Sequence, residues 1–276
     1  MVDLDPLFSH YHNLKYQKML HYIGVYPMNQ NYGDPIADAI GETYKALIQH
    51  LKFIKYNRID VVLFNDEFPP QDYGIENNII GLKSNIVRYF VEYDPRKFQA
   101  LSPSQKVVEI YSLIFLGMNK IAAANSWDIK LFDEVEEKVK QYNYKVPIAL
   151  HKLIRSPDKS KYAAVEFIAE DGYTNFTVEV YDTMKIKIKS ISLWKSYPVI
   201  FFNKYFFHSF SWISADIFTI VDECNEIYFN CNVEEGSVAI TYKPEQHSIQ
   251  DLEDLLRGMR YDTSPEIRVK LLRFGR

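Results

Sequence analysis

Glycine is scarce in this chain, and no familiar catalytic or cofactor motif occurs in it. The 276 residues include only 10 glycines, about half the usual share of ~7%. Few glycines leave few loops whose backbone can approach a phosphate closely. The sequence has no P-loop, no dinucleotide fingerprint after a strand and no G-x-S-x-G elbow. These absences argue against the common nucleotide-binding and hydrolase classes and lead us to expect no cofactor.

Cysteine is almost as rare, because only Cys224 and Cys231 are present. They are not spaced as a CxxC pair, and two thiols are too few for a disulfide framework. We therefore expect buried free thiols in a reducing compartment. The first residues are acidic and lack a basic start and an apolar core, so we expect no secretion signal. Together these features predict a cytoplasmic protein.

An excess of positive charge is also missing. The net charge is −4, and residues 1–145 and 146–276 each contain 16 basic and 18 acidic side chains. This balance favours neither a nucleic acid nor an anionic membrane as a partner.

Metal ligands at recognisable spacing are absent as well. His10 and His12 would share one face of a strand, but no carboxylate or cysteine nearby completes a site. An ordinary surface pair is the favoured interpretation, and we predict no metal. Asp66 and Glu67 follow a short strand and could serve in acid–base chemistry, although acids at the start of a loop are usually only solvated. An enzyme of unknown class, with a site near the 65–84 loop, therefore stays the alternative function.

What the sequence does contain is a long apolar segment at residues 102–142, which reads as two consecutive helices. Ser102 and Gln105 form a capping-box start. The first helix is apolar on nearly every side, so other elements must cover it. We expect it to be too short, and too interrupted by Glu109, to span a bilayer. An earlier helix begins with Asp34 and Pro35, and short strands are predicted at 58–64 and 86–93.

After Val146 the hydrophobic period changes from helical to two, which predicts strands. The clearest signal is a hairpin over 162–182 with Asp171 and Gly172 at its turn. Next to it, Ile186 and Ile188 are predicted to share the face of Val178 and Val180. A second hairpin is expected over 226–243, followed by a helix at 248–257 and a strand at 267–271.

The fold class predicted from these patterns is α+β. We expect a helical N-terminal half, with a few strands, packed against a mainly antiparallel β-sheet in the C-terminal half. The corresponding domains are 1–145, and 146–276 with a C-terminal helix. One continuous domain is the alternative.

Charge is segregated in the last third of the chain. Residues 183–215 contain five lysines and no acid, whereas 216–254 contain ten acids and only one base, Lys243. Part of this excess is explained by helix capping and turn solvation. The other interpretation is an acidic face that attracts a basic partner.

Aromatic residues are concentrated just before the acidic segment, at 201–212. Most of them should fill a core, and the remainder could anchor a partner. We therefore predict a non-enzymatic protein-binding module, for example an immunity or inhibitor protein that neutralises a basic toxin or nuclease. Its oligomeric state stays open. The predicted partner-binding residues are the acids and aromatics Asp222, Glu223, Glu226, Glu234, Glu235, Phe207, Phe210 and Trp212.

Overall fold

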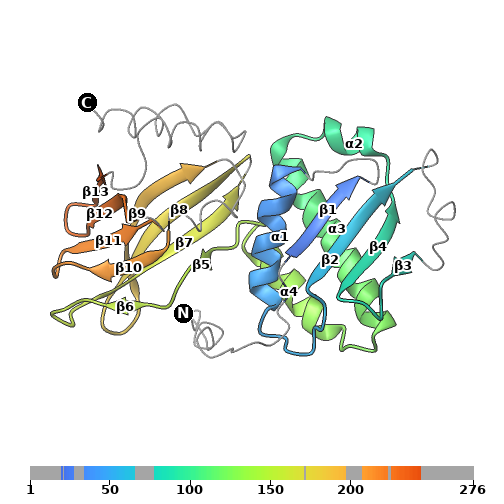
Figure 1. The fold of residues 1–276 in the computed structure, drawn as a ribbon, viewed down its shortest axis with the longest axis horizontal. Coiled ribbons are helices and arrows are strands. Elements are labelled where there is room, and N and C mark those ends of the chain that lie inside the picture. Colours follow the sequence, from blue (N-terminus) through green and yellow to red (C-terminus); the bar gives the residue numbers. More distant parts are fainter. Residues whose placement is uncertain are drawn as a thin grey trace. The chain divides into compact units, whose positions relative to one another are not determined.

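The computed structural model describes residues 20, 22–27, 34–65, 78–170, 172–196, 207–222 and 225–243. Contacts divide the chain into two compact units (Figure 1). Unit 1 comprises Met1–Val146 and Ala169–Gly172, and unit 2 comprises Pro147–Ile168 and Tyr173–Arg276. The domain boundary near Lys145 stays a prediction, because contacts do not test whether either part folds alone. The predicted helix at 248–257 and strand at 267–271 lie outside the described residues.

Unit 1 is built on a four-stranded sheet with the order β1-β2-β4-β3. Strands β1, β2 and β4 run parallel, and β3 pairs with β4 in the antiparallel direction. Helices α1 and α3 pack against the sheet (Figure 1). In chain order the elements are β1 (Tyr22–Pro27), α1 (Pro35–Ile48), β2 (Arg58–Phe64), β3 (Ile79–Ile80), β4 (Ile86–Glu92), α2 (Pro95–Ala100), α3 (Pro103–Ala124) and α4 (Lys130–Gln141).

The N-terminal half is not the helical unit that we predicted. The described part of the chain is α+β, with four helices and three sheets, and most strands lie in its C-terminal half. The error came from treating the short apolar runs as minor elements. These runs are strands that pair in parallel with their neighbours and form the layer that the helices cover. Their centres are buried; Ile59 and Val61 of β2, for example, are 0% exposed. Strands buried in this way read as short apolar runs without alternation.

Helix α3 begins with the predicted capping box. The Ser102 hydroxyl accepts from the Gln105 N–H, and the Gln105 side chain accepts from the Ser102 N–H. The expectation that this helix is too short for a bilayer was wrong. Among the described residues it is the one helix long and apolar enough, by length and composition, to cross a membrane, and 56% of its apolar window is buried inside the protein.

Two glycines show how closely the helices approach the sheet. A Cβ added to Gly117 of α3 would lie 2.6 Å from Cγ2 of Val61 in β2. A Cβ added to Gly41 of α1 would lie 2.0 Å from the carbonyl oxygen of Ile23 in β1. Side chains do not fit at such distances, so both helices require glycine where they meet the strands. This packing is typical of a core helix.

Unit 2 consists of two antiparallel sheets. One has the order β5-β7-β8-β9, with β6 also pairing with β7, and the other has the order β10-β11-β12-β13. The strands are β5 (Ile148–Ala149), β6 (Ile154–Arg155), β7 (Tyr162–Glu170), β8 (Tyr173–Tyr181), β9 (Lys187–Ser196), β10 (Ser209–Trp212), β11 (Ile217–Val221), β12 (Ile227–Asn232) and β13 (Ser237–Tyr242).

Aromatic rings join the two sheets of unit 2. The buried Phe207 ring lies 4.8 Å from Phe176 of β8 and 5.6 Å from Phe229 of β12, measured between ring centroids. Phe176 also lies 6.0 Å from Phe167 of β7. Buried aromatic side chains of this kind contribute much of the hydrophobic stabilisation of a small core.

Strand β9 departs from the predicted pattern. Ile186 and Ile188 are 56% and 59% exposed, so they do not share the buried face of Val178 and Val180. The pairing of β8 with β9 is irregular between Val180 and Tyr181, where two residues of β8 oppose three of β9. Before this bulge, the register already sets Val178 opposite Ile191 and Val180 opposite Lys189, so odd-numbered residues of β9 share the face of these valines. The buried β9 side chains are therefore Ile191 and Leu193.

Candidate binding surface

Two of the predicted partner-binding acids are buried in unit 2. Asp222 is 1% exposed, and its Oδ1 accepts from the N–H groups of Glu226 at 2.7 Å and Ile227 at 2.8 Å. It therefore holds the turn between β11 and β12 in place. Glu226 is 3% exposed. Neither carboxylate can belong to a solvent-facing surface in this structure, and Glu223 lies outside the described residues. Asp222 and Glu226 are therefore not part of the acidic face that we expected over 216–254.

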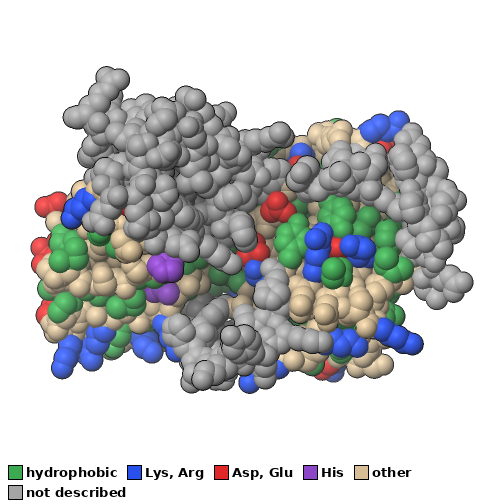
Figure 2. Space-filling model, viewed as in Figure 1, with side chains coloured by type: hydrophobic (Ala, Val, Ile, Leu, Met, Phe, Trp, Pro, Cys, Tyr) green, Lys and Arg blue, Asp and Glu red, His purple; other side chains and the backbone are tan. Residues whose placement is uncertain are grey.

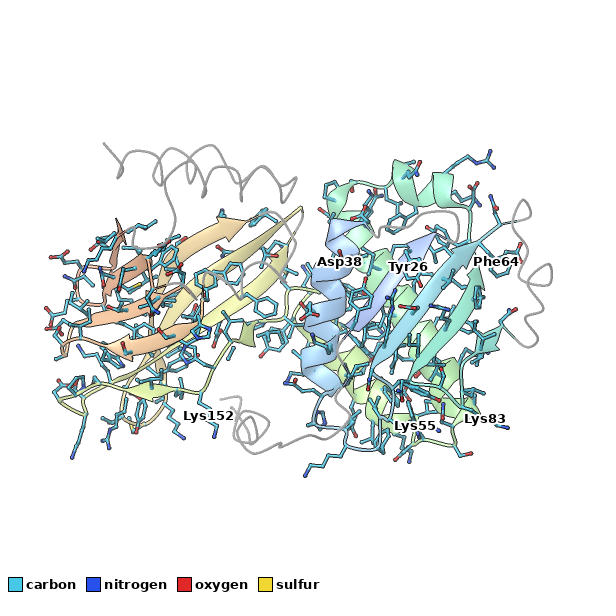
Figure 3. All side chains as sticks on the ribbon, in the orientation of Figure 1. Tyr26, Asp38, Lys55, Phe64, Lys83 and Lys152 are labelled. Carbon is cyan, nitrogen blue, oxygen red and sulfur yellow. The ribbon has the colours of Figure 1, made fainter. Side chains whose placement is uncertain are left out.

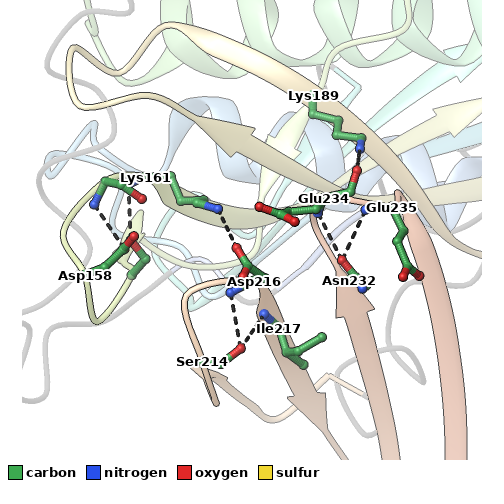
Figure 4. Close-up of polar contacts among 11 residues, drawn as sticks. Asp158, Lys161, Lys189, Ser214, Asp216, Ile217, Asn232, Glu234 and Glu235 are labelled. Atoms are coloured by element: carbon green, nitrogen blue, oxygen red, sulfur yellow. Dashed lines mark hydrogen bonds and ion pairs between the residues drawn. The ribbon is translucent and has the colours of Figure 1, made fainter.

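The other two predicted acids, Glu234 and Glu235, are exposed. They lie in the turn between β12 and β13, where Asn232 Oδ1 accepts from both of their N–H groups at 3.1 Å (Figure 4). Lys189 of β9 donates to the Glu234 carbonyl oxygen, which ties the turn to the neighbouring sheet. The Ser237 hydroxyl donates to Glu235 at 3.0 Å. Both side chains are thus presented to solvent from an ordered turn.

The predicted aromatic anchors contribute to the core of unit 2. Phe207 is 5% exposed and connects the two sheets. The Phe210 ring lies 3.9 Å from the His151 ring. The Trp212 indole N–H donates to the Ile154 carbonyl at 2.9 Å, as a half-buried Trp usually requires. These contacts use the aromatic surface inside the unit, so the structure gives the three residues a packing role.

Among the histidines in the described ranges, His151 most resembles a functional one, and its contacts explain it as structural. Its Nε2 accepts from the Val165 N–H at 3.1 Å, and its Nδ1 lies 2.6 Å from the Lys152 carbonyl oxygen. Nδ1 must therefore carry the proton, because a carbonyl can only accept. Burial lowers the pKa of His151 to about 4, although the bond to the Lys152 carbonyl opposes this. The ring is thus a neutral connector between a strand and a loop.

Large apolar side chains are exposed near one end of unit 2. Ile213 and Met184 are 65% and 74% exposed, and with Ile186 and Ile188 they are the four most exposed large hydrophobic side chains among the described residues. We call this end the turn surface and define it as the turns 156–161, 182–186, 213–216 and 233–236 with the first two residues of β9. Isolated exposed hydrophobic residues are ordinary, whereas several in neighbouring turns indicate an interaction site.

Three of the four turns are joined by polar contacts, and β9, which follows turn 182–186, contacts the last of them (Figure 4). Lys161 forms an ion pair with Asp216 at 2.9 Å, which joins the first turn to the third. The Val233 N–H donates to the Asp216 carbonyl at 2.8 Å, which joins the third turn to the fourth. Lys189, near the start of β9, reaches the fourth turn as described above. The apolar side chains are therefore carried by neighbouring turns rather than by separate loops.

The turn that carries Met184 and Ile186 is itself well defined. Asp182 Oδ1 accepts from the N–H groups of Met184 and Ile186, at 2.9 and 2.8 Å. The Asp182 N–H donates to the Ile186 carbonyl at 2.9 Å, and Lys185 has a φ of +62°. A turn fixed by its own hydrogen bonds loses little conformational entropy when a partner binds. The alternating sequence 184–189 led us to place Ile186 and Ile188 on the face of Val178 and Val180, so their exposure was not predicted.

The alternative enzymatic site cannot be built from the described residues. Asp66, Glu67, His10 and His12 lie outside them. Within the described ranges, no group of three or more His, Cys, Asp or Glu side chains is arranged to hold a metal ion.

Comparison with known proteins adds no relative: no family model, no curated protein and no solved structure matches the chain.

Proposed function

We propose that the chain is a non-enzymatic, cytoplasmic protein-binding module that binds its partner through the turn surface of unit 2. The observation that carries this proposal is the exposure of Met184, Ile186, Ile188 and Ile213 in and beside neighbouring, hydrogen-bonded turns. Apolar side chains on an ordered surface contribute binding free energy when a partner removes them from water. Cys231, a free buried thiol, is consistent with a reducing compartment.

The turn surface carries charges of both signs: Glu234 and Glu235 are exposed, and so are Lys159, Lys185 and Lys187. The two acids lie in the fourth turn of this surface, and an anionic membrane would repel them. A basic rim on a protein partner would instead pair with them and speed association. An inhibitor or immunity protein that acts on a basic toxin or nuclease could therefore use two of the predicted acids, Glu234 and Glu235. It would also use the four exposed apolar side chains.

The proposal is tested by quantitative capture from native lysate, followed by affinity measurement with the protein identified. Ile186→Ser combined with Ile213→Ser should weaken that complex about tenfold or more, because both side chains would lie in its apolar centre. Glu234→Lys with Glu235→Lys should mainly slow association, and more strongly at low salt. Leu116→Ser is the matched control, since this side chain is 40% exposed on α3 of unit 1.

Three outcomes would contradict the proposal. The captured proteins could be the same for the wild-type chain and the Ile186→Ser/Ile213→Ser variant. Leu116→Ser could weaken the complex as much as that variant does. Lastly, the wild-type chain could sediment with vesicles of phosphatidylserine and phosphatidylcholine while the variant does not, which would make the turn surface a membrane contact.

A further inference from the structure

The two faces of the unit 1 sheet differ in chemistry. Residues of β2 alternate between the faces, and Val61 points to the helices because it meets Gly117 of α3. Arg58, Asp60 and Val62 therefore point to the second face. The strand register adds residues of β1 and β4 to it, namely Tyr22, Gly24, Tyr26, Arg88 and Phe90. Figure 2 shows this face over β1, β2 and β4, where basic and acidic side chains lie within an apolar surface.

A buried carboxylate binds two arginines at the centre of this face. Asp60 is 0% exposed, and its Oδ1 and Oδ2 accept from Nε of Arg58 at 2.7 Å and from Nε of Arg88 at 3.1 Å. The two arginine side chains are 41% and 39% exposed. One carboxylate thus holds two guanidinium groups, and Asp38 of α1 is a second acid that acts electrostatically on Arg58. Because each arginine uses Nε for Asp60, its terminal N–H groups remain beside solvent and the Tyr26 hydroxyl.

Two tyrosines of β1 fix the position of Arg58. Its guanidinium carbon lies 4.9 Å from the centre of the Tyr22 ring and 5.9 Å from that of Tyr26. The Tyr22 ring extends over Gly24, where an added Cβ would lie 2.4 Å from the ring. The Tyr22 hydroxyl donates to Asp38 of α1 at 2.8 Å. Arg58 is therefore held by an acid and two rings before any ligand arrives (Figure 3 labels Tyr26 on β1 and Asp38 on α1).

A structural role alone explains this group poorly. Replacing a buried ion pair by apolar residues is often neutral or stabilising, and the same face has the apolar Val62 and Phe90 at the next positions, 3% and 4% exposed. Arg88 is not needed to neutralise Asp60, because Arg58 already pairs with this carboxylate. Pre-positioned guanidinium groups that are partly exposed to solvent are suited to oxyanions.

We propose that the arginine-bearing second face of the unit 1 sheet binds a phosphate monoester that carries an aromatic group. Two guanidinium groups offer enough N–H donors for the three terminal oxygens of a phosphate, whereas a carboxylate is fully paired by one guanidinium fork. The aromatic group of the ligand lies on the partly exposed side chains of Tyr26, Phe64 and Ile80, which pack over the buried Val62 and Phe90. Recognition uses side chains on strands, which agrees with the scarcity of glycine loops.

Isothermal titration with three probes tests this inference on the full chain: adenosine monophosphate, inorganic phosphate and adenosine. Adenosine monophosphate should bind at least tenfold more tightly than either part alone. Arg88→Lys keeps the charge beside Asp60 but loses the fork, and it should weaken binding about tenfold. Arg96→Lys is the matched control, because Arg96 also bonds an aspartate, Asp94, through Nε but is 81% exposed on α2. It should bind as the wild type does.

Circular dichroism on both variants separates lost binding from lost folding, and Arg88→Gln is examined if Arg88→Lys unfolds. The inference is overturned if the wild-type chain binds none of the three probes at millimolar concentration. It is also overturned if Arg96→Lys weakens binding as much as Arg88→Lys does, or if a glutamate-rich peptide binds this face more tightly than adenosine monophosphate, which would assign the arginines to a protein partner.

Discussion

Two side chains in unit 2, Asp222 and His151, resemble functional residues but have structural roles. Asp222 belongs to the acid-rich segment, yet its carboxylate serves the backbone of a turn. His151 has the polar contacts and the perturbed pKa that often mark an active site. Both of its ring nitrogens, however, bind backbone groups, and a buried polar group without such partners would be costly. Burial and backbone pairing, not chemistry on a substrate, account for both residues.

The contacts of His151 predict a pH dependence of stability. The pKa of the buried ring is about 4, below the ~6.5 of an unfolded histidine. Between these values the unfolded chain binds the extra proton, so stability is complete above about pH 6.5 and falls as the pH drops towards 4. We expect a loss of about 2 kcal/mol, allowing for the part of the ring that water reaches.

Urea unfolding of wild type and His151→Gln at pH 4.5 and pH 7.5 measures this effect. The glutamine can keep polar contacts but does not titrate, so the variant should lose less stability on acidification than the wild type. Equal losses in the two proteins would show that other groups, and not His151, govern acid unfolding.

At the scale of elements, the sequence correctly predicted helix starts and a hairpin turn, because these features depend on residues that are close together in the chain. The capping box at Ser102, the Asp34 cap of α1 and the second hairpin of unit 2 all have the predicted positions. Capping and turn chemistry act within a few residues, so a sequence displays them directly. The parallel pairing of β1 with β2 was not visible, because it joins segments separated by a helix.

The candidate surfaces could be predicted only in part for the same reason. The exposure of Ile186 and Ile188 depends on the register of β9 against β8, which sets Lys189 opposite Val180, and an alternating sequence does not reveal this register. The triad of Arg58, Asp60 and Arg88 depends on the register of β2 and β4. Glu234 and Glu235 were predicted as exposed acids because a turn of polar residues was evident from the sequence.

Packing between α3 and β2 gives a prediction at this scale. Gly117→Ala should destabilise the protein by about 1 kcal/mol, because overpacking against Val61 costs about 1–3 kcal/mol and the gain in helix propensity is only about 1 kcal/mol. In the double variant Gly117→Ala/Val61→Ala the space is restored. Its destabilisation should then be about 1 kcal/mol smaller than the sum of the two single changes.

Chemical denaturation of the four proteins in this cycle measures the coupling. Ser112→Ala is the control on the exposed side of α3, and its stability should stay within about 0.5 kcal/mol of the wild type. Strictly additive costs for Gly117→Ala and Val61→Ala would mean that α3 does not pack on β2 in solution.

At the scale of the whole molecule, the division of contacts into two units predicts that a destabilising substitution affects mainly the unit in which it lies. Gly41→Ala should affect unit 1, since its added Cβ meets the Ile23 carbonyl oxygen at 2.0 Å and backbone cannot easily move aside. Asp222→Ala should affect unit 2, because two buried N–H groups lose their acceptor at a cost of about 2 kcal/mol. Each unit has its own core, so each can open by itself.

Hydrogen exchange followed by mass spectrometry distinguishes this behaviour from a single cooperative transition. Gly41→Ala should speed exchange in the β2 and α3 amides while leaving β11 and β12 unchanged, and Asp222→Ala should do the reverse. The fully conservative Asp222→Asn, which keeps an acceptor oxygen, should have a smaller effect. If either variant speeds exchange equally in both units, the chain unfolds as one body, and the turn surface and the arginine face cannot be altered independently.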